Sequence, residues 1–176
     1  MEGLAELIDS KLHFVRVFRY APVTVLLVEL RGEPCVLKAA PVCSEWGYAH
    51  LMQEYKVLRK APMVRGITSL VRFYGEKNGY VSLLKTYFEG VELGYIDRIS
   101  DTIASQLMTT LNELHSIGIG RFDIAPANII VSLANQEARF VDLGYCVLRE
   151  ELNPNEFEEI KREDIESLES LLNPLS

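Results

Sequence analysis

The chain has 176 residues, of which 48% are hydrophobic and 24% are charged, a composition typical of a folded globular protein rather than a disordered segment. Its formal net charge of −7 argues against bulk attraction to nucleic acid or to an anionic membrane, so we expect no direct nucleic-acid binding. No run of residues is apolar for long enough to span a bilayer, which predicts no membrane insertion. The three cysteines form no C-x-x-C pair, which favours free thiols in a cytoplasmic protein.

The first half of the chain has the pattern of a β-rich unit with one helix. Runs rich in Val, Leu and Phe predict strands, and turn residues such as R-G-E-P at 31–34 separate them. Ser44 is a good N-cap, and Leu51, Tyr55 and Leu58 fall on one face of the helix that it opens. The predicted strands are 13–19, 24–30, 34–40, 70–75 and 80–84, and the predicted helix is 44–60.

The second half combines long helices with short strands. Ser100 and Asp101 begin a helix with a regular apolar stripe, and Gly118 ends it. Two strand-like runs follow, R-F-D-I-A-P-A-N-I-I-V and A-R-F-V-D-L-G-Y-C-V-L. The sequence of 163–172 is typical of a helix, which would be the last element. Strands followed by helices indicate an α+β protein. We therefore expect a sheet-rich unit over residues 1–86 and a mainly helical unit with one hairpin over 87–176.

Three polar residues of the second half stand out chemically. Asp123 and Asn128 are five positions apart, and Asp142 follows on the next strand-like run. A hairpin between the two runs would bring these oxygen-bearing side chains to one end, a ligand set that suits Mg²⁺. Asp123 lies between Phe122 and Ile124, and a carboxylate in apolar company is a candidate acid or base.

The same residues resemble the protein-kinase superfamily, in which an H-R-D-L-x-x-x-N loop precedes D-F-G. This chain has R-F-D-I-A-P-A-N and then D-L-G in the same order. The resemblance implies an α+β, two-lobed protein-kinase-like fold with a truncated helical C-lobe. It also implies Asp123 as the catalytic base and Asn128 and Asp142 as Mg²⁺ ligands.

Further parts of the chain carry the same resemblance. Lys38 in V-L-K-A is similar to the kinase V-A-I-K, and Glu54 follows sixteen positions later in the predicted helix. The resemblance implies that Lys38 contacts the phosphates of ATP and that Glu54 orients it. Asp164, in R-E-D-I-E-S-L-E-S-L-L, corresponds to a helix-opening residue that braces the catalytic loop. The hinge residues that would offer backbone groups to adenine are Thr86, Tyr87 and Phe88.

The chain also departs from the kinase pattern. The expected glycine-rich loop reads F-R-Y-A-P-V-T, in which Pro22 lacks a backbone donor for phosphate. Ala125 replaces the loop lysine of serine/threonine kinases, and Arg121 and Phe122 replace the His-Arg pair. Only residues 145–163 separate Gly144 from Asp164, which is short for an activation segment. This brevity resembles the minimal atypical kinases, namely the RIO family and the kinase subunit of the KEOPS complex.

Three functions remain open from the sequence. The first is a minimal atypical serine/threonine protein kinase that uses ATP and Mg²⁺ and acts on a protein substrate or partner. The second is a pseudokinase that binds a nucleotide or a partner, favoured by the missing glycines and by Ala125. The third is a small-molecule kinase of the aminoglycoside-phosphotransferase type. Structural interpretations compete with these roles, because Lys38 could lie at a sheet edge, Glu54 could be solvated, and Asp123, Asn128 and Asp142 could be turn residues.

Overall fold

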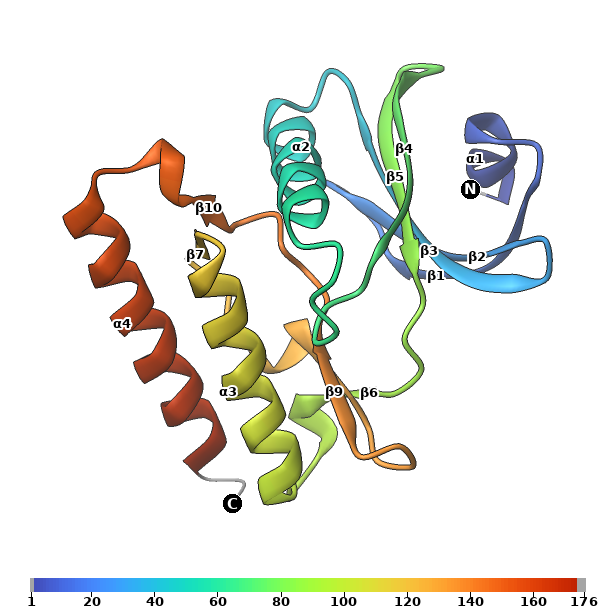
Figure 1. Cartoon of the computed structure of the whole chain (residues 1–176). Coiled ribbons are helices and arrows are strands. Elements are labelled where there is room, and N and C mark those ends of the chain that lie inside the picture. The colour runs from blue at the N-terminus through green and yellow to red at the C-terminus, as the bar shows by residue number, and fades with distance from the viewer. Residues whose placement is uncertain (1, 174–176) are drawn as a thin grey trace. The chain divides into compact units, whose positions relative to one another are not determined.

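The computed structural model describes residues 2–173 and has an α+β architecture (Figure 1). The chain divides into two compact units. The first contains the residues up to Lys56 together with Ser69–Tyr87, and the second contains Val57–Thr68 and the residues from Phe88 onward. The chain therefore passes between the units within helix α2 (Glu45–Lys60), between Thr68 and Ser69, and after Tyr87.

The first unit is built on a five-stranded antiparallel sheet in the order β1-β2-β3-β5-β4. All five predicted strands are confirmed, and each end lies within two residues of its predicted position. The strands are β1 (Leu12–Arg19), β2 (Thr24–Leu30), β3 (Glu33–Pro41), β4 (Leu70–Lys77) and β5 (Tyr80–Thr86).

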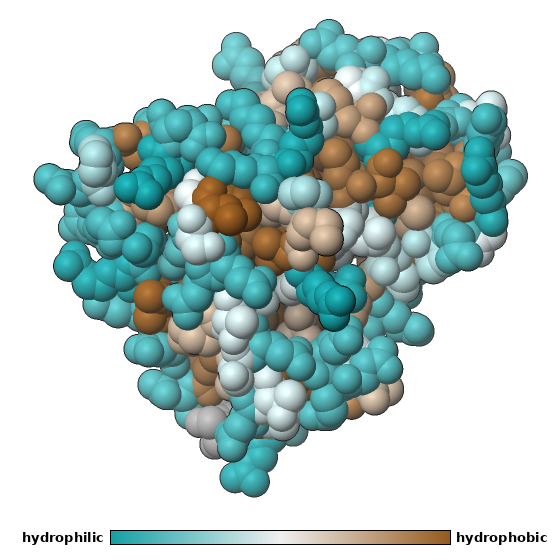
Figure 2. Space-filling model, in the orientation of Figure 1, coloured by the Kyte–Doolittle hydropathy of each residue, from teal (hydrophilic) through white to brown (hydrophobic). Residues whose placement is uncertain are grey.

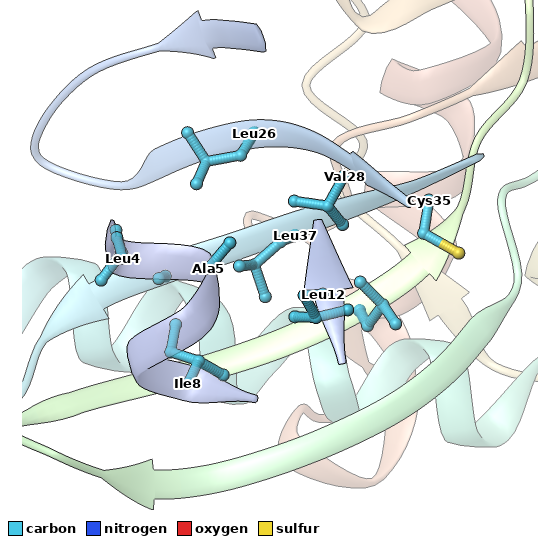
Figure 3. Packing of buried hydrophobic residues seen from close by; sticks show 10 residues of the cluster. Leu4, Ala5, Ile8, Leu12, Leu26, Val28, Cys35 and Leu37 are labelled. Carbon is cyan, nitrogen blue, oxygen red and sulfur yellow. The ribbon is translucent and has the colours of Figure 1, made fainter. Parts of the chain in front are cut away.

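Both faces of this sheet are covered, because side chains alternate along each strand. On β3, Leu37 and Ala39 belong to one apolar cluster, whereas Ala40 belongs to the other. Helix α1 (Glu2–Ile8) covers the first face and α2 the second (Figure 1). Figure 3 shows Leu4 and Ile8 of α1 in one cluster with Leu26, Val28 and Leu37 of the strands. Full burial of each such side chain contributes about 1.5–3 kcal/mol.

Helix α1 is also held at its C-terminal end by polar contacts from the β4–β5 hairpin. Lys77 Nζ donates to the carbonyl of Ile8 and Asn78 Nδ2 to the carbonyl of Leu7, each at 2.6 Å. Asp9 accepts from Tyr74 Oη at 3.1 Å. Burial and this hydrogen bond to a carboxylate raise the pKa of Tyr74 to about 12. The sequence analysis predicted no helix here, and these contacts explain how so short a helix is kept in place.

In the second unit, α3 (Asp101–Ser116) and α4 (Pro154–Leu172) lie side by side and antiparallel (Figure 1). The predicted start of α3 is confirmed, since Ser100 Oγ accepts from the Ile103 N–H at 3.3 Å. Gly118, at φ +78°, follows its end as predicted. The remaining elements are a three-stranded sheet of β6 (Val91–Glu92), β8 (Ile129–Ser132) and β9 (Glu137–Phe140), a pair of β7 (Ile119–Gly120) with β10 (Val147–Leu148), and the 3₁₀ turns Leu93–Tyr95, Pro126–Asn128 and Arg149–Glu151.

The last helix begins nine residues earlier than the predicted 163–172. Pro154 fits the first helical turn, where no N–H partner is required, and Glu156 Oε2 accepts from the Asn153 N–H at 3.0 Å. The sequence analysis did not use Pro154 and Glu156 as helix-start signals, because they lie in an acidic stretch that was interpreted as a solvated surface. As a result, Asp164 lies inside α4 and not at its opening, and the predicted role of Asp164 as a helix-opening residue is wrong.

The surface is mostly hydrophilic on the face drawn in Figure 2, with hydrophobic residues in small groups. None of the helices in the described part of the chain is both long and apolar enough to cross a membrane. All three cysteines are free, Cys35 and Cys146 in buried positions and Cys43 at the surface.

Candidate functional site

The first unit contains a buried ion-pair network centred on Glu54. Lys38 Nζ lies 2.5 Å from Glu54 Oε2, and Lys85 Nζ lies 2.5 Å from Glu54 Oε1. Glu54 has no exposed surface, and the lysines are 3% and 2% exposed. The structure thus brings together Lys38 and Glu54, which the sequence analysis paired, and adds a second lysine to the same carboxylate.

Strand register explains why these three side chains meet. Lys38 of β3 is opposite Leu83 of β5, so Lys85, two residues further on, projects from the same face of the sheet. Helix α2 covers that face and supplies Glu54 from its third turn. Charges so deeply buried are stable only when each is well paired, and removal of one partner of such a pair typically costs about 3–5 kcal/mol.

Lys85 was missed by the sequence analysis although its signal resembles that of Lys38. It ends the run V-S-L-L-K, just as Lys38 follows V-L in an apolar strand. The predicted strand ends at residue 84, so Lys85 falls just outside it. The strand extends to Thr86, and this extension places Lys85 inside the sheet.

The predicted hinge residues have different surroundings. Thr86 makes two hydrogen bonds to Ser69, the residue before β4. Its N–H donates to the Ser69 carbonyl and its Oγ1 accepts from the Ser69 N–H, both at 2.9 Å. Tyr87 stacks on Phe18 with ring centroids 6.3 Å apart. Phe88 belongs to the second unit, where the Arg139 guanidinium lies 4.4 Å from the centre of its ring.

In the second unit, Asp123 and Asn128 are directly connected. Asn128 Nδ2 donates to the backbone oxygen and to Oδ2 of Asp123, each at 2.9 Å. Asn128 ends the 3₁₀ turn that begins with Pro126, and β8 starts immediately after it. The loop therefore closes on itself with the Asp123 carboxylate at an exposed position.

Asp142 lies beyond the other strand of the predicted hairpin, which is present as β8 and β9. Ile129 pairs with Phe140, and the Val141 N–H donates to the Asn128 carbonyl at 3.0 Å. Asn128 and Asp142 therefore flank the same open end of the hairpin. Oxygen ligands from two adjacent chain segments are the donor type that Mg²⁺ prefers, so this set fits the metal that the sequence predicted.

Asp164 supports the loop that carries Asp123. Its Oδ1 accepts from the Phe122 N–H and its Oδ2 from the Arg121 N–H, both at 2.9 Å. Arg121 has a left-handed φ of +57°, a conformation that costs a non-glycine residue about 1–2 kcal/mol, and the bond to Asp164 offsets this cost. The predicted bracing of the loop by Asp164 is therefore confirmed, from a position inside α4.

His115 adds a third contact to Asp164 that the sequence analysis did not foresee. Its Nε2 lies 2.9 Å from Asp164 Oδ2, and the His115 ring is buried. Its Nδ1 has no hydrogen-bond partner among the described residues. The Nε2–H tautomer satisfies this geometry, because a neutral ring donates from one nitrogen only. His115 therefore packs at the end of α3 and helps to fix the bracing carboxylate.

Comparison with known proteins agrees with this arrangement. No family model matches the chain. A stretch of 82 residues is 37% identical to serine/threonine-protein kinase D of Synechocystis sp., and it covers 44% of this chain and 16% of that protein. The structure is similar to the crystal structure of Rad53 1–466 in complex with AMP-PNP, with a TM-score of 0.79 and 20% sequence identity.

That structural match covers 96% of this chain and 48% of the Rad53 chain, so the chain spans about half the length of the solved protein. The resemblance in brevity to the RIO and KEOPS kinases stays a prediction. What the structural match establishes is the architecture, since similarity at this level of identity concerns the fold and not the activity. This chain has a protein-kinase-like fold.

Proposed function

We propose that the chain is a minimal protein-kinase-like phosphotransferase that moves the γ-phosphoryl group of ATP to a hydroxyl group of a protein substrate. The observation that carries the proposal is the loop from Arg121 to Asn128. Its backbone is bonded to the buried carboxylate of Asp164, and its side chains Asp123 and Asn128 are bonded to each other. A loop held at both ends fixes the direction of a carboxylate that would otherwise be mobile.

In the proposed reaction, Asp123 orients the substrate hydroxyl and accepts its proton as the oxygen attacks the γ-phosphorus. Asn128 and Asp142 would hold Mg²⁺, and the ion would neutralise charge on the phosphates. The attacking oxygen forms a bond to the γ-phosphorus as the bond from that phosphorus to the β,γ-bridging oxygen of ATP breaks, and ADP leaves with that oxygen. The residues contribute positioning and charge stabilisation, because phosphoryl transfer needs little covalent chemistry from the protein.

The first unit supplies the proposed nucleotide contacts. Lys38, held by Glu54, provides an ammonium group for the phosphates. Adenine recognition falls to the backbone of Tyr87 and Phe88, because the Thr86 N–H already donates to Ser69.

A pseudokinase is the second candidate, favoured by the turn between β1 and β2. That turn contains Pro22, which has no N–H to donate, and the glycines of a phosphate-binding loop are absent from it. Ala125 likewise brings no charge to the loop that carries Asp123. In this alternative the chain binds a nucleotide or a protein partner and transfers little phosphate.

Radiolabelled γ-phosphate transfer, to the protein itself and to a generic basic protein, tests the proposal. Wild type is compared with Asp142→Ala, and Asp97→Ala, at an exposed loop position, is the matched control. We expect incorporation by wild type and Asp97→Ala and none by Asp142→Ala. Mg-ATP binding without incorporation in wild type would favour the pseudokinase. Incorporation by Asp142→Ala at the wild-type rate would contradict the assignment of Asp142.

A further inference from the structure

Two lysines from neighbouring strands share one carboxylate in the first unit. Glu54 of α2 accepts from Lys38 of β3 on one oxygen and from Lys85 of β5 on the other, and each distance is 2.5 Å. The three side chains are at most 3% exposed. The contact with Lys85 therefore attaches α2 to a second strand of the sheet, independently of the contact with Lys38.

The two lysines bond to different oxygens of Glu54, and this arrangement affects what the ammonium of Lys38 can do. An ammonium group has three donors, so Lys38 can bond to Glu54 and to a phosphate at the same time if the carboxylate stays in place. If Lys38 were the only group on Glu54, a shift of its ammonium toward a phosphate would carry the carboxylate with it or break the pair. Because Lys85 donates to Oε1, Glu54 keeps its position. The Lys38 ammonium can then bond to a phosphate without losing its contact with Glu54.

An apolar residue at position 85 would serve folding alone at least as well. The neighbours of Lys85 in the sheet include Val36 and Leu70, its partners on β3 and β4, and Leu83, two residues before it. Burial of an ammonium costs several kcal/mol before pairing, whereas an apolar side chain of similar volume has no such cost. The charge of Lys85 is paired with Glu54 Oε1, a bond that an apolar side chain could not make.

We propose that Lys85 is a positioning residue for the nucleotide lysine: it holds Glu54 so that the ammonium of Lys38 is fixed for the phosphates before the nucleotide arrives. The inference rests on the proposed function, in which Lys38 binds phosphate. It makes the Lys38–Glu54 pair a property of the folded first unit and not a state that a ligand or regulator must induce. Lys85 itself acts through Glu54 and does not touch the nucleotide.

A double-mutant cycle on Mg-ATP binding tests this indirect action. Calorimetry measures the Kd of Mg-ATP for wild type, Lys85→Met, Lys38→Met and the double variant, with Lys161→Met, which removes a helix-surface ion pair, as the control. We expect Lys85→Met to raise the Kd roughly tenfold, typical of a lost charged hydrogen bond. In the Lys38→Met background, the same change should have no further effect. Lys85→Arg should recover most of the affinity, and adenosine, which lacks phosphates, should bind all variants alike.

Two results of this cycle would overturn the proposal. A wild-type Kd in Lys85→Met would show that Glu54 needs no second lysine. An equal loss in the presence and absence of Lys38 would show that Lys85 acts independently, through direct contact or damage to the fold. If Lys85→Met does not fold, Lys85→Gln takes its place in the same cycle, with a smaller loss of the same kind expected.

A spectroscopic measurement on the protein without nucleotide separates this inference from the proposed function. Nitrogen NMR of the lysine ammonium groups reports directly on Lys38. We expect the Lys38 signal to shift or broaden in Lys85→Met and to return in Lys85→Arg, while Lys161→Met leaves it unchanged. An unchanged Lys38 signal in Lys85→Met refutes the inference. Absence of Mg-ATP binding in wild type refutes the proposed function alone.

Discussion

Asn128 donates both hydrogens of its side-chain amide to Asp123, one to the backbone oxygen and one to Oδ2, at 2.9 Å each. An amide has two donors and one acceptor oxygen, so these bonds fix its orientation. Asn128 Oδ1 is then the atom that we assign to Mg²⁺. The same bonds hold the Asp123 carboxylate, so the proposed metal ligand and the proposed base position each other.

The first prediction separates the roles of the two aspartates. Asp123→Asn keeps the size of the side chain and an acceptor for Asn128 but removes the base. We expect Mg-ATP affinity to survive, with phosphoryl transfer reduced roughly 10²–10⁴-fold, the usual contribution of a general base. Asp142→Asn should weaken Mg-ATP binding and transfer together, because a metal ligand loses its charge. Calorimetry and a transfer assay on both variants check this, and wild-type transfer by Asp123→Asn would show that Asp123 is only a turn residue.

The second prediction concerns the bracing of the loop by Asp164. Asp164→Ala removes the acceptor of the Arg121 and Phe122 N–H groups, and a lost charged hydrogen bond costs about 1.5–3 kcal/mol. We expect unfolding in urea to show a loss of roughly 3 kcal/mol. Glu163→Ala, at the exposed neighbouring position, should stay within about 0.5 kcal/mol of wild type. A loss in Asp164→Ala no larger than the loss in this control would contradict the bracing role.

The third prediction concerns the stability of the first unit. Glu54→Gln removes the carboxylate that two buried lysines share, so we expect a loss of roughly 3–5 kcal/mol in the free energy of unfolding. Lys38→Met should cost less, because Glu54 keeps the contact with Lys85. Denaturation of both variants in urea, beside Glu166→Gln on the exposed face of α4, measures the difference. Equal losses in the two buried variants would argue against the shared carboxylate.

The fourth prediction is that Lys38→Met loses the stabilisation by Mg-ATP at the concentration that stabilises wild type, because its Kd for Mg-ATP rises but stays measurable by calorimetry at higher concentration. A ligand present at one hundred times its Kd stabilises the folded protein by about 2.7 kcal/mol, which raises the melting temperature. Without the Lys38 ammonium we expect no rise at the Mg-ATP concentration that stabilises wild type. Thermal unfolding with and without Mg-ATP measures this effect. An undiminished rise would show that other residues hold the phosphates.

The fifth prediction uses the alkaline titration of Tyr74, whose pKa is raised from 10.0 to about 12 by burial and by Asp9. Between these values the unfolded chain releases the phenol proton and the folded protein keeps it, so stability falls as pH rises. Tyr74→Phe lacks this proton and should be the less stable protein at pH 8, where it loses the bond to Asp9. We expect the gap in urea midpoint to narrow from about pH 10 upward. A constant gap up to pH 12 would show that the pKa is not raised.

Much of the fold could be predicted from local patterns. The five strands of the first unit follow β-branched and aromatic runs between turn residues, and the start of α3 follows from the Ser100 cap. The candidate loop could also be predicted, since the spacing of Asp123 and Asn128 is a matter of sequence and a five-residue separation suits a closed turn. Such features depend on residues that are close along the chain.

Three features could not be read from the sequence in the same way. Helix α1 is seven residues long, which is too short to be stable alone, and it forms because Leu4, Ala5 and Ile8 pack on the sheet. The N-terminal part of α4 was hidden in an acidic run whose buried residue, Phe157, has few apolar neighbours in sequence. Lys85 fell outside the predicted strand 80–84 because the end of β5 depends on its pairing with β3 and not on local composition.

The sequence by itself therefore determined the order of the elements and which residues could carry phosphoryl-transfer chemistry. Only the tertiary structure decided how Glu54 is used, because the register of β3 against β5 brings Lys85 beside Lys38, and that register joins residues 47 positions apart. It likewise decided that Asp164 braces the loop from within α4, 42 residues away from Phe122. Contacts of this range depend on the packing of whole elements, and burial then makes their charges act strongly on one another.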